Sequence, residues 1–383
     1  MTDIGEDSCY QKTRGSMMKN LFIRMMTASM GKRKRKTLPK DFDQLLRDAP
    51  LAELIAVFDV CELEATGGYS KCTALGFYNC PDDLVRWLVE QGANVDARDL
   101  YQRTALHHRS SSWIGGVDLL LDLGADIEAQ DSKGDTPLQV AVESHKADSI
   151  AALIRRGANT EVRTRRQGYS LLHLALLTAS NGDIRATAKI AEILLEAGAQ
   201  VEDAMQSEVE RIGREFEFHR ADFNPDYLAA TDAALATLYR LFNVTPVAAR
   251  NIHDGQAAIV VTADDWPAQH QQLWEMLVPS SGAAKTVQGE VIRISGRISI
   301  EINDNGSANW DADFKKMLNA LVEYLGSAVP LSEPELAEAR TLAAALKSGN
   351  DPAGHTDRLC ELAVCWVIAN PLPELLSTTS YGR

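Results

Sequence analysis

Apolar residues recur at helical spacing over most of the chain, and one arrangement of them returns several times. Four amphipathic stretches, each followed by a Gly-Ala pair, occur at residues 84–89, 117–121, 150–154 and 190–195. A glycine after such a stretch permits the left-handed backbone that ends a helix, so each stretch is predicted to be a helix that stops at its pair. The four glycines, at 92, 124, 157 and 198, lie 32, 33 and 41 residues apart, which indicates an internal repeat.

A second, shorter element precedes each of these helices. It opens with a hydroxyl residue two positions before a leucine, at Thr73, Thr104, Thr136 and Ser170. The hydroxyl of such a residue caps a helix N-terminus, and Pro137 suits the first helical position, where no backbone N–H partner is lost. Each repeat is therefore predicted to contain a turn and two helices.

This unit resembles the ankyrin repeat, a β-turn followed by two antiparallel helices in about 33 residues. The resemblance covers residues 67–201 and implies about four repeats, each of which buries its apolar surface only against its neighbours. The repeats are degenerate, because Lys71 and Gln102 stand where the turn glycine belongs. Arg109 stands where a small apolar residue normally packs, and His107 stands where the family has a structural histidine.

The flanking regions are also predicted to be helical. Apolar positions around Pro50 indicate a helical N-terminal cap, and those after Val201 indicate helices at about 203–218, 227–242, 263–278, 286–303, 309–326, 332–347 and 355–369, with a short extended piece at 259–261. The predicted fold class is all-α, an ankyrin-repeat solenoid followed by an α-helical C-terminal domain. The predicted domains are a disordered basic tail (1–37), a helical cap (38–66), the repeats (67–201), a helical connecting segment (202–245) and an all-α domain (246–383).

The segment 277–297, together with Asn309-Trp310-Asp311-Ala312-Asp313, resembles a segment of uncharacterised bacterial proteins. Several of those proteins combine it with ankyrin repeats, and some resemble immunity proteins of contact-dependent toxin systems. The resemblance implies a bacterial protein in the cytoplasm.

Charge is distributed unevenly. The net charge is −14, but residues 1–40 carry ten Lys and Arg against three acids, so the remainder carries −14 − 7 = −21. An acidic body of this size repels nucleic acid and anionic membranes, which favours a protein partner and would suit a basic one. The basic run at 32–36 is more typical of a solvated tail than of a nuclear-import signal or a phosphate-binding arm. No apolar run approaches the length of a membrane span.

The candidate chemical groups are better explained as structural. Glu290 and Arg293 are spaced like an ordinary ion pair on a helix surface, and Asp311 and Asp313 fit the first turn of a helix. The chain has no phosphate-binding glycine loop, and its cysteines lack zinc-site spacing. The sequence therefore predicts neither enzyme activity, nor a cofactor, nor a metal site.

The tips of the repeat turns are the predicted functional surface, because residues flanking the turn commonly contact partners in ankyrin proteins. These tips are rich in Tyr and Arg, which are enriched in binding hot spots. The predicted partner-binding residues are Tyr69, Lys71, Leu100, Tyr101, Arg103, Lys133, Asp135, Arg166, Gln167 and Tyr169. The sequence thus favours a non-enzymatic protein-binding module, such as an immunity or antitoxin protein that occludes a toxin. Two alternatives remain open: a host-directed effector or scaffold, and an enzyme in residues 246–383 that the repeats target.

Overall fold

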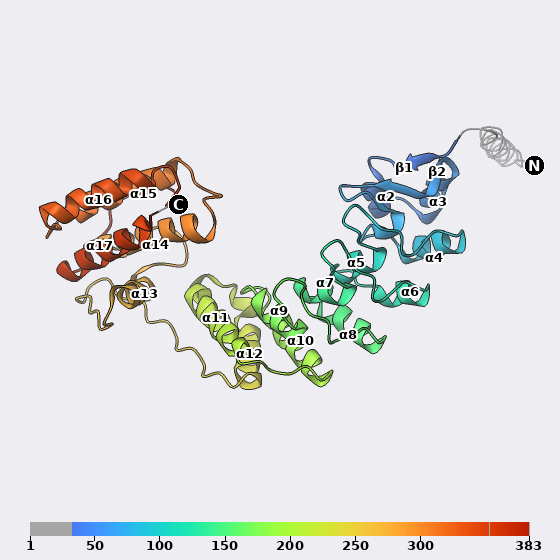
Figure 1. The fold of residues 1–383 in the computed structure, drawn as a ribbon, viewed down its shortest axis with the longest axis horizontal. Coiled ribbons are helices and arrows are strands. Elements are labelled where there is room, and N and C mark those ends of the chain that lie inside the picture. Colours follow the sequence, from blue (N-terminus) through green and yellow to red (C-terminus); the bar gives the residue numbers. More distant parts are fainter. Residues whose placement is uncertain (1–32, 352, 383) are drawn as a thin grey trace, which may run out of the picture. The chain divides into compact units, whose positions relative to one another are not determined.

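The computed structural model describes residues 33–351 and 353–382, and it divides into two compact units (Figure 1). The first contains the described residues up to 212 together with 230–244. The second contains 213–229 and the residues from 245 onward. This division lies next to the predicted boundary at 245/246, but it assigns part of the predicted connecting segment to the second unit.

The first unit begins with a small sheet that the sequence did not predict. It contains β1 (Arg35–Thr37), α2 (Phe42–Asp48), α3 (Leu51–Val60), β2 (Cys61–Gly67) and β3 (Cys72–Thr73). β2 is the central strand, parallel to β1 and antiparallel to β3. The prediction of a wholly helical cap over 38–66 is therefore wrong in its last six residues.

The prediction of a disordered tail is wrong for its last residues. Residues 35–37 form β1, an exposed edge strand, and residues 1–32 lie outside the described part of the chain. The strand tolerates its basic side chains because an edge leaves them in solvent. Lys34, just before the strand, is tied to helix α3, since its Nζ donates a hydrogen bond to the Phe58 carbonyl at 2.6 Å.

The repeats follow as pairs of short helices, and this confirms the predicted solenoid. The pairs are η1 (Ala74–Gly76) with α4 (Asp82–Glu90), α5 (Ala105–Ser110) with α6 (Val117–Asp122), α7 (Pro137–Glu143) with α8 (Ala147–Arg155), and α9 (Leu171–Leu177) with α10 (Ile184–Glu196). The four predicted helix-ending glycines all have positive φ angles, between 89° and 98°. In the first repeat the inner helix is reduced to a single 3₁₀ turn.

Beyond the repeats, the chain continues as α11 (Ala204–His219), a short 3₁₀ turn (Arg220–Asp222) and α12 (Pro225–Leu241). The second unit then adds α13 (Trp266–Leu277), α14 (Val287–Ser299), a π-helical turn (Ile300–Asp304), α15 (Ala312–Leu325), α16 (Glu333–Leu346) and α17 (His355–Ala369). These bounds agree with the predicted helices to within a few residues. Residues 259–261 form no strand, although Ile259 is buried and its N–H donates to the Pro371 carbonyl at 2.7 Å.

Helix α14 is the centre of the second unit. Eleven of its thirteen residues are buried, although its sequence suggested a helix with one exposed, charged face. Its close packing depends on Gly296, where a Cβ atom would lie 2.5 Å from Cζ3 of Trp274 on α13. No helix among the described residues is both long and apolar enough to cross a membrane.

Candidate protein-binding site

The turns that precede α5 and α7 are built by the same device. In each, a buried aspartate accepts hydrogen bonds from two backbone N–H groups of its own turn. Asp99 accepts from Tyr101 and Arg103 at 2.8 and 2.9 Å, and Asp131 accepts from Lys133 and Asp135 at 2.8 and 3.1 Å. These carboxylates fix the turns and are not available to a partner.

Successive turns are also tied to one another. The Leu100 N–H donates to the Ser70 carbonyl at 2.9 Å, and the Ser132 N–H donates to the Tyr101 carbonyl at 2.8 Å. Arg103 Nε adds a contact to Asp131 Oδ2 at 3.1 Å. The first three turns therefore form a continuous, preformed edge of the repeats.

Below the turns, His107 links the second repeat to the third. Its Nδ1 lies 3.1 Å from the Thr104 N–H, which can only donate, so Nδ1 is unprotonated. Nε2 then carries the proton and donates to the Asp135 carbonyl at 3.1 Å. Burial lowers the pKa of His107, which agrees with this neutral form. His107 thus has the structural role that the resemblance implied.

Gln139 performs the same function one repeat later. Its Oε1 accepts from the Thr136 N–H at 3.0 Å, and its Nε2 donates to the Arg163 carbonyl at 3.3 Å. An amide can replace a neutral imidazole here because both combine one acceptor with one donor. The neighbouring His108 has a different partner, since its Nε2 lies 3.0 Å from Asp99 Oδ2.

The unusual Arg109 is buried and satisfies loop carbonyls. It donates to the carbonyls of Cys80 and, at 3.3 Å, Gly115, and it contacts Asp82 Oδ1 at 3.3 Å. The side chain thus joins the first repeat to the loop after α5. A position where the family packs a small residue is polar here because it has these acceptors.

Three hydrophobic side chains project from the first two turns. Tyr69 is 90% exposed, Leu100 is 65% exposed and Tyr101 is 44% exposed. A hydrogen bond with Tyr69 raises the pKa of the Tyr101 phenol, so the two tyrosines lie together. These three exposed side chains do not contribute to the core of the repeats, and an exposed apolar group of this kind is typical of an interaction site.

A cavity of about 530 Å³ lies at the third and fourth turns. It brings together four of the predicted residues, Lys133, Asp135, Arg166 and Gln167. It also includes Arg165, which the sequence analysis missed although Arg163, Arg165 and Arg166 form an obvious basic cluster. The predicted residue Tyr169 does not line this cavity. Its half-buried ring packs on the ring of His173, with 4.4 Å between the two ring centres.

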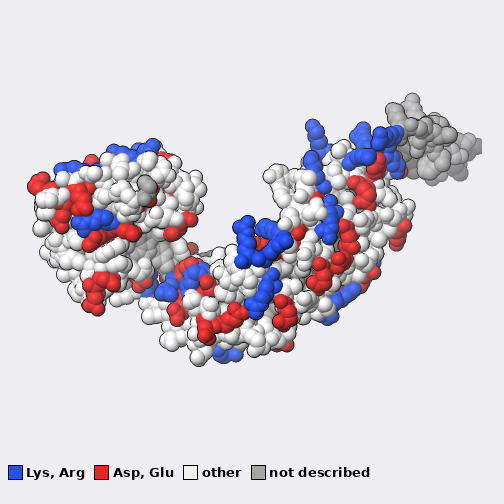
Figure 2. Space-filling model, viewed as in Figure 1, with Lys and Arg blue, Asp and Glu red and all other residues white. Residues whose placement is uncertain are grey.

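The charge of this edge is opposite to that of the chain. Figure 2 shows Lys and Arg side chains along the edge of the repeats that carries the turns, with most acidic side chains below them. The cations of the turns and the residues just before them are Lys71, Arg98, Arg103, Lys133, Arg163, Arg165 and Arg166. In the same segments Asp99 and Asp131 are buried, and Asp135 is half-buried. Net charge alone was therefore a poor guide to the partner of this surface.

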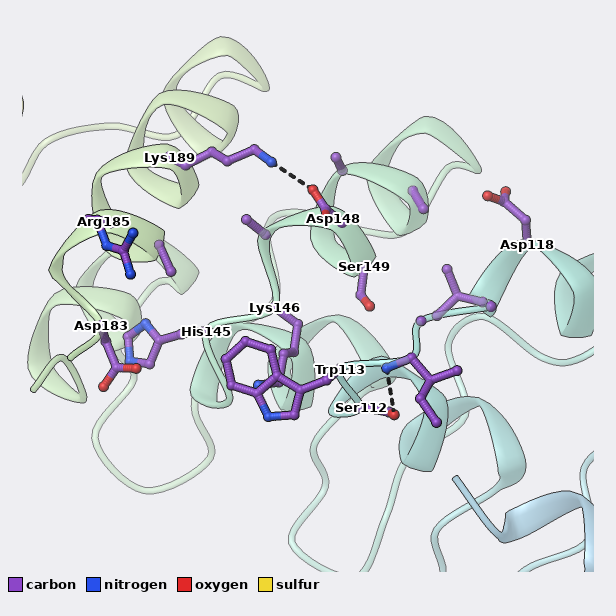
Figure 3. A pocket seen from close by; sticks show the side chains of 18 of the residues that line it. Ser112, Trp113, Asp118, His145, Lys146, Asp148, Ser149, Asp183, Arg185 and Lys189 are labelled. Atoms are coloured by element: carbon purple, nitrogen blue, oxygen red, sulfur yellow. Dashed lines mark hydrogen bonds and ion pairs between the residues drawn. The ribbon is translucent and has the colours of Figure 1, made fainter. Parts of the chain in front are cut away.

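A second exposed surface lies at the other ends of the inner helices, where the loops follow α5, α7 and α9. Here a hollow of about 770 Å³ is bordered by Trp113, which is 90% exposed and was not singled out from the sequence. Lys146 Nζ lies 3.1 Å from the centre of its ring, as Figure 3 shows from close by. The Lys189–Asp148 ion pair at 2.6 Å neutralises part of the charge around the hollow.

In the second unit, Asp311 beside Trp310 caps α15. It accepts hydrogen bonds from the N–H groups of Asp313 and Phe314 at 2.9 and 3.3 Å, so it is the N-cap and lies just before the first turn in which the sequence placed it, whereas Asp313 does lie in that turn. Among the described residues, no group of three or more His, Cys, Asp or Glu is arranged to hold a metal ion.

Glu290 and Arg293 form an ion pair, but not the surface pair that was predicted. Both side chains are 0% exposed, and two hydrogen bonds of 2.6 and 2.7 Å join them. Glu290 also accepts from the Ala284 N–H at 2.9 Å and from the Tyr381 hydroxyl at 2.8 Å. The pair fastens Tyr381 to α14, and the Glu290 side chain is not exposed to solvent.

Comparisons with known proteins agree with the repeat architecture. Residues 111–204 match the family model for ankyrin repeats in three copies. The chain is 30% identical to human Rabankyrin-5 over 125 residues, which are 32% of this chain and 10% of that protein. It is 36% identical to a putative ankyrin repeat protein of Rickettsia bellii over 109 residues, 28% of this chain and 60% of the relative.

A third relative is the B-cell lymphoma 3 protein homolog of mouse, 31% identical over 131 residues, 33% of this chain and 28% of the relative. The chain thus spans less than two thirds of the length of each of these relatives. The second unit lies outside the family match. The chain carries ankyrin repeats, which are protein–protein interaction modules.

Proposed function

We propose that this chain binds a partner protein through the edge formed by its repeat turns, hereafter the turn row. The turn row comprises Tyr69, Lys71, Leu100, Tyr101, Arg103, Lys133, Asp135, Arg165, Arg166 and Gln167. The observation that carries the proposal is the exposed group of Tyr69, Leu100 and Tyr101 on a hydrogen-bonded backbone edge. Exposed aromatic side chains at a fixed position are typical of binding hot spots.

The rigidity of this edge supports binding without rearrangement. Because the first three turns are already tied to one another, a partner would not have to order them, and the entropic cost of association there would be small. A preformed surface of this kind suits an inhibitor that covers a functional surface of its partner. We therefore propose an antitoxin-like or immunity role as the narrower function, supported also by the resemblance of the segment 277–297.

The charge of the turn row changes the expected partner within this proposal. The sequence suggested a basic toxin because the chain as a whole is acidic. A basic surface facing Lys133, Arg165 and Arg166 would be repelled at the contact itself, and like charges across an interface cost several kcal/mol. The occlusion mechanism does not depend on a basic partner.

Affinity purification of the tagged full-length chain from its native host tests the proposal. We expect a stoichiometric partner that is lost when Leu100 and Tyr101 are both changed to Ala. The matched control is Trp113→Ala, which removes an even more exposed aromatic side chain from the opposite ends of the inner helices. Loss of the partner from the Trp113 variant but not from the double variant would place binding on the wrong surface and contradict the proposal.

A further inference from the structure

We propose that the turn row recognises an acidic protein segment that also carries an exposed aliphatic or aromatic residue. The apolar residue packs against Tyr69, Leu100 and Tyr101, and the carboxylates that accompany it face Lys133, Arg165 and Arg166. This inference rests on the proposed function and adds the chemistry of the partner.

Lys71, in the first turn, is exposed. The cations of the other turns and of the residues just before them fall into two groups. Arg98 and Arg103 are engaged in holding the turns, through the Gln130 carbonyl at 2.6 Å and Asp131 at 3.1 Å. Arg163 donates to the Gly168 carbonyl at 2.9 Å and contacts Glu202 at 3.4 Å. These three side chains are part of the scaffold.

The second group, Lys133, Arg165 and Arg166, is exposed and makes no ion pair with any residue that the structure describes. All three line the cavity at the third and fourth turns. Arg165 lies against the third turn, since a Cβ atom on Gly134 would lie 3.4 Å from its Cδ. Three neighbouring cations of this kind attract carboxylates.

Two carboxylates border the same cavity against its three cations, so they offset only part of its positive charge. Glu143 is the last residue of α7, and Asp135 is half-buried behind the tip of its turn. Burial raises the pKa of Asp135, which shows that its charge is poorly solvated. The cations, in contrast, come from the turn tips, where a partner makes its first contact.

The arrangement also gives the partner segment a direction. Apolar side chains occupy the first two turns together with Lys71, and the three unpaired cations Lys133, Arg165 and Arg166 occupy the third and fourth. Because consecutive turns lie side by side, a segment that follows the row meets an apolar patch first and a basic patch after it. The matching ligand has an apolar anchor at one end and carboxylates towards the other.

A nucleic acid would also offer negative charge and flat rings, but the rest of the chain disfavours it. The chain carries a net charge of −14, which repels a polyanion at long range. A short acidic peptide is repelled much less, because its charge is local and screened beyond about 10 Å at moderate salt.

The test is selection of 12-residue peptides from a random phage-displayed library against the full-length chain. We expect the enriched peptides to be acidic and to contain at least one large apolar residue. A synthetic peptide from the selection should lose affinity by about tenfold or more when Arg165 and Arg166 are both changed to Glu. The matched control reverses two exposed arginines elsewhere, Arg86→Glu with Arg340→Glu, and should change affinity by less than about twofold.

Different failures have different meanings. Enriched peptides that are neutral or basic, but depend on Leu100 and Tyr101, would overturn the acidic-partner inference and leave the proposed function intact. Selected peptides whose affinity changes neither in the Leu100/Tyr101 variant nor in the Arg165/Arg166 variant would contradict the proposed function itself. If the unchanged chain enriches no peptide more strongly than the Arg165/Arg166 variant does, the inference is overturned. A single-stranded 20-nucleotide DNA that binds as tightly as the best peptide and is lost in the same variant also overturns it.

Discussion

Two sets of buried polar groups, one in each unit of this protein, are held in opposite ways. In the repeats, His107 and Gln139 are buried but uncharged, and each ties its helix to the backbone of the next repeat. In the second unit, Glu290 and Arg293 are buried as a charged pair, and Glu290 holds Tyr381, 91 residues further along the chain. The first arrangement is local and repeated, whereas the second is a single long-range connection.

This difference predicts how much of the fold is destabilised when one of these polar side chains is removed. Losing a neutral link between two repeats leaves the other interfaces intact, because a solenoid is stabilised by nearest neighbours. Losing one member of a buried ion pair leaves the other as an uncompensated charge, which is among the most destabilising changes known. The two units should therefore respond very differently to the loss of one polar side chain.

The largest effect is expected from Glu290→Ala. We expect the second unit to lose about 3–5 kcal/mol, because Arg293 would remain charged and buried. Urea unfolding of the full chain, followed by fluorescence of Trp266, Trp274, Trp310 and Trp366 against that of Trp87 and Trp113, separates the two units. The double variant Glu290→Leu with Arg293→Met should be far less destabilised, since it removes both charges. Equal unfolding of both units in Glu290→Ala would show that the pair does not act within the second unit alone.

A smaller effect is expected from pH, through His270 on α13. Burial lowers its pKa from 6.5 to about 4, so the folded second unit binds fewer protons than the unfolded chain. Its contribution is complete above the unfolded pKa of about 6.5 and is lost as the pH falls towards 4. At pH 5 the loss is at most about 2 kcal/mol. Urea midpoints at pH 7.5 and 5 measure it, and His270→Gln should flatten the difference; an unchanged difference would assign it to other groups.

The sequence predicted the repeats well because their signals are local. A glycine that ends a helix, a threonine that caps one and a period near 33 residues are all visible without knowing the fold. Strand β1 could not be predicted in this way, because it pairs with residues of β2 that lie 26 or more positions away.

The second unit and the candidate site show the same limit. The spacing of Glu290 and Arg293 is identical in an exposed and in a buried pair, and only the packing around α14 distinguishes them. The predicted tip residues came from turn positions. Their surplus of positive charge became visible only when Asp99 and Asp131 proved to be buried.

The third prediction concerns the link between the second and third repeats. His107→Ala should destabilise the first unit by about 1–2 kcal/mol, because it leaves the Thr104 N–H and the Asp135 carbonyl buried without this partner. His107→Gln should recover most of that loss, since Gln139 makes the same two bonds in the next repeat. Unfolding of the first unit followed by Trp87 and Trp113 fluorescence compares the three proteins. If Gln recovers nothing, the imidazole contributes by packing and not by its hydrogen bonds.

The smallest effect is expected from the strained turn of the second repeat. Gln102 has a φ of 60°, in the left-handed region where the equivalent Gly134 has 87°. A non-glycine residue at this φ costs about 1–2 kcal/mol. Glycine removes this strain, but it loses more conformational entropy on folding, so only part of the cost is recovered. Gln102→Gly should therefore stabilise the first unit by about 0.5–1 kcal/mol.

The reverse exchange at the matched position, Gly134→Ala, should destabilise the same unit by a similar amount. Its φ disfavours a side chain, and the added Cβ would lie 3.4 Å from Arg165. Urea midpoints of the first unit measure both variants, and neither change should move the transition of the second unit. A destabilised Gln102→Gly variant would mean that the glutamine side chain contributes more than its backbone strain costs. The degenerate turn would then be a stabilising substitution and not a tolerated one.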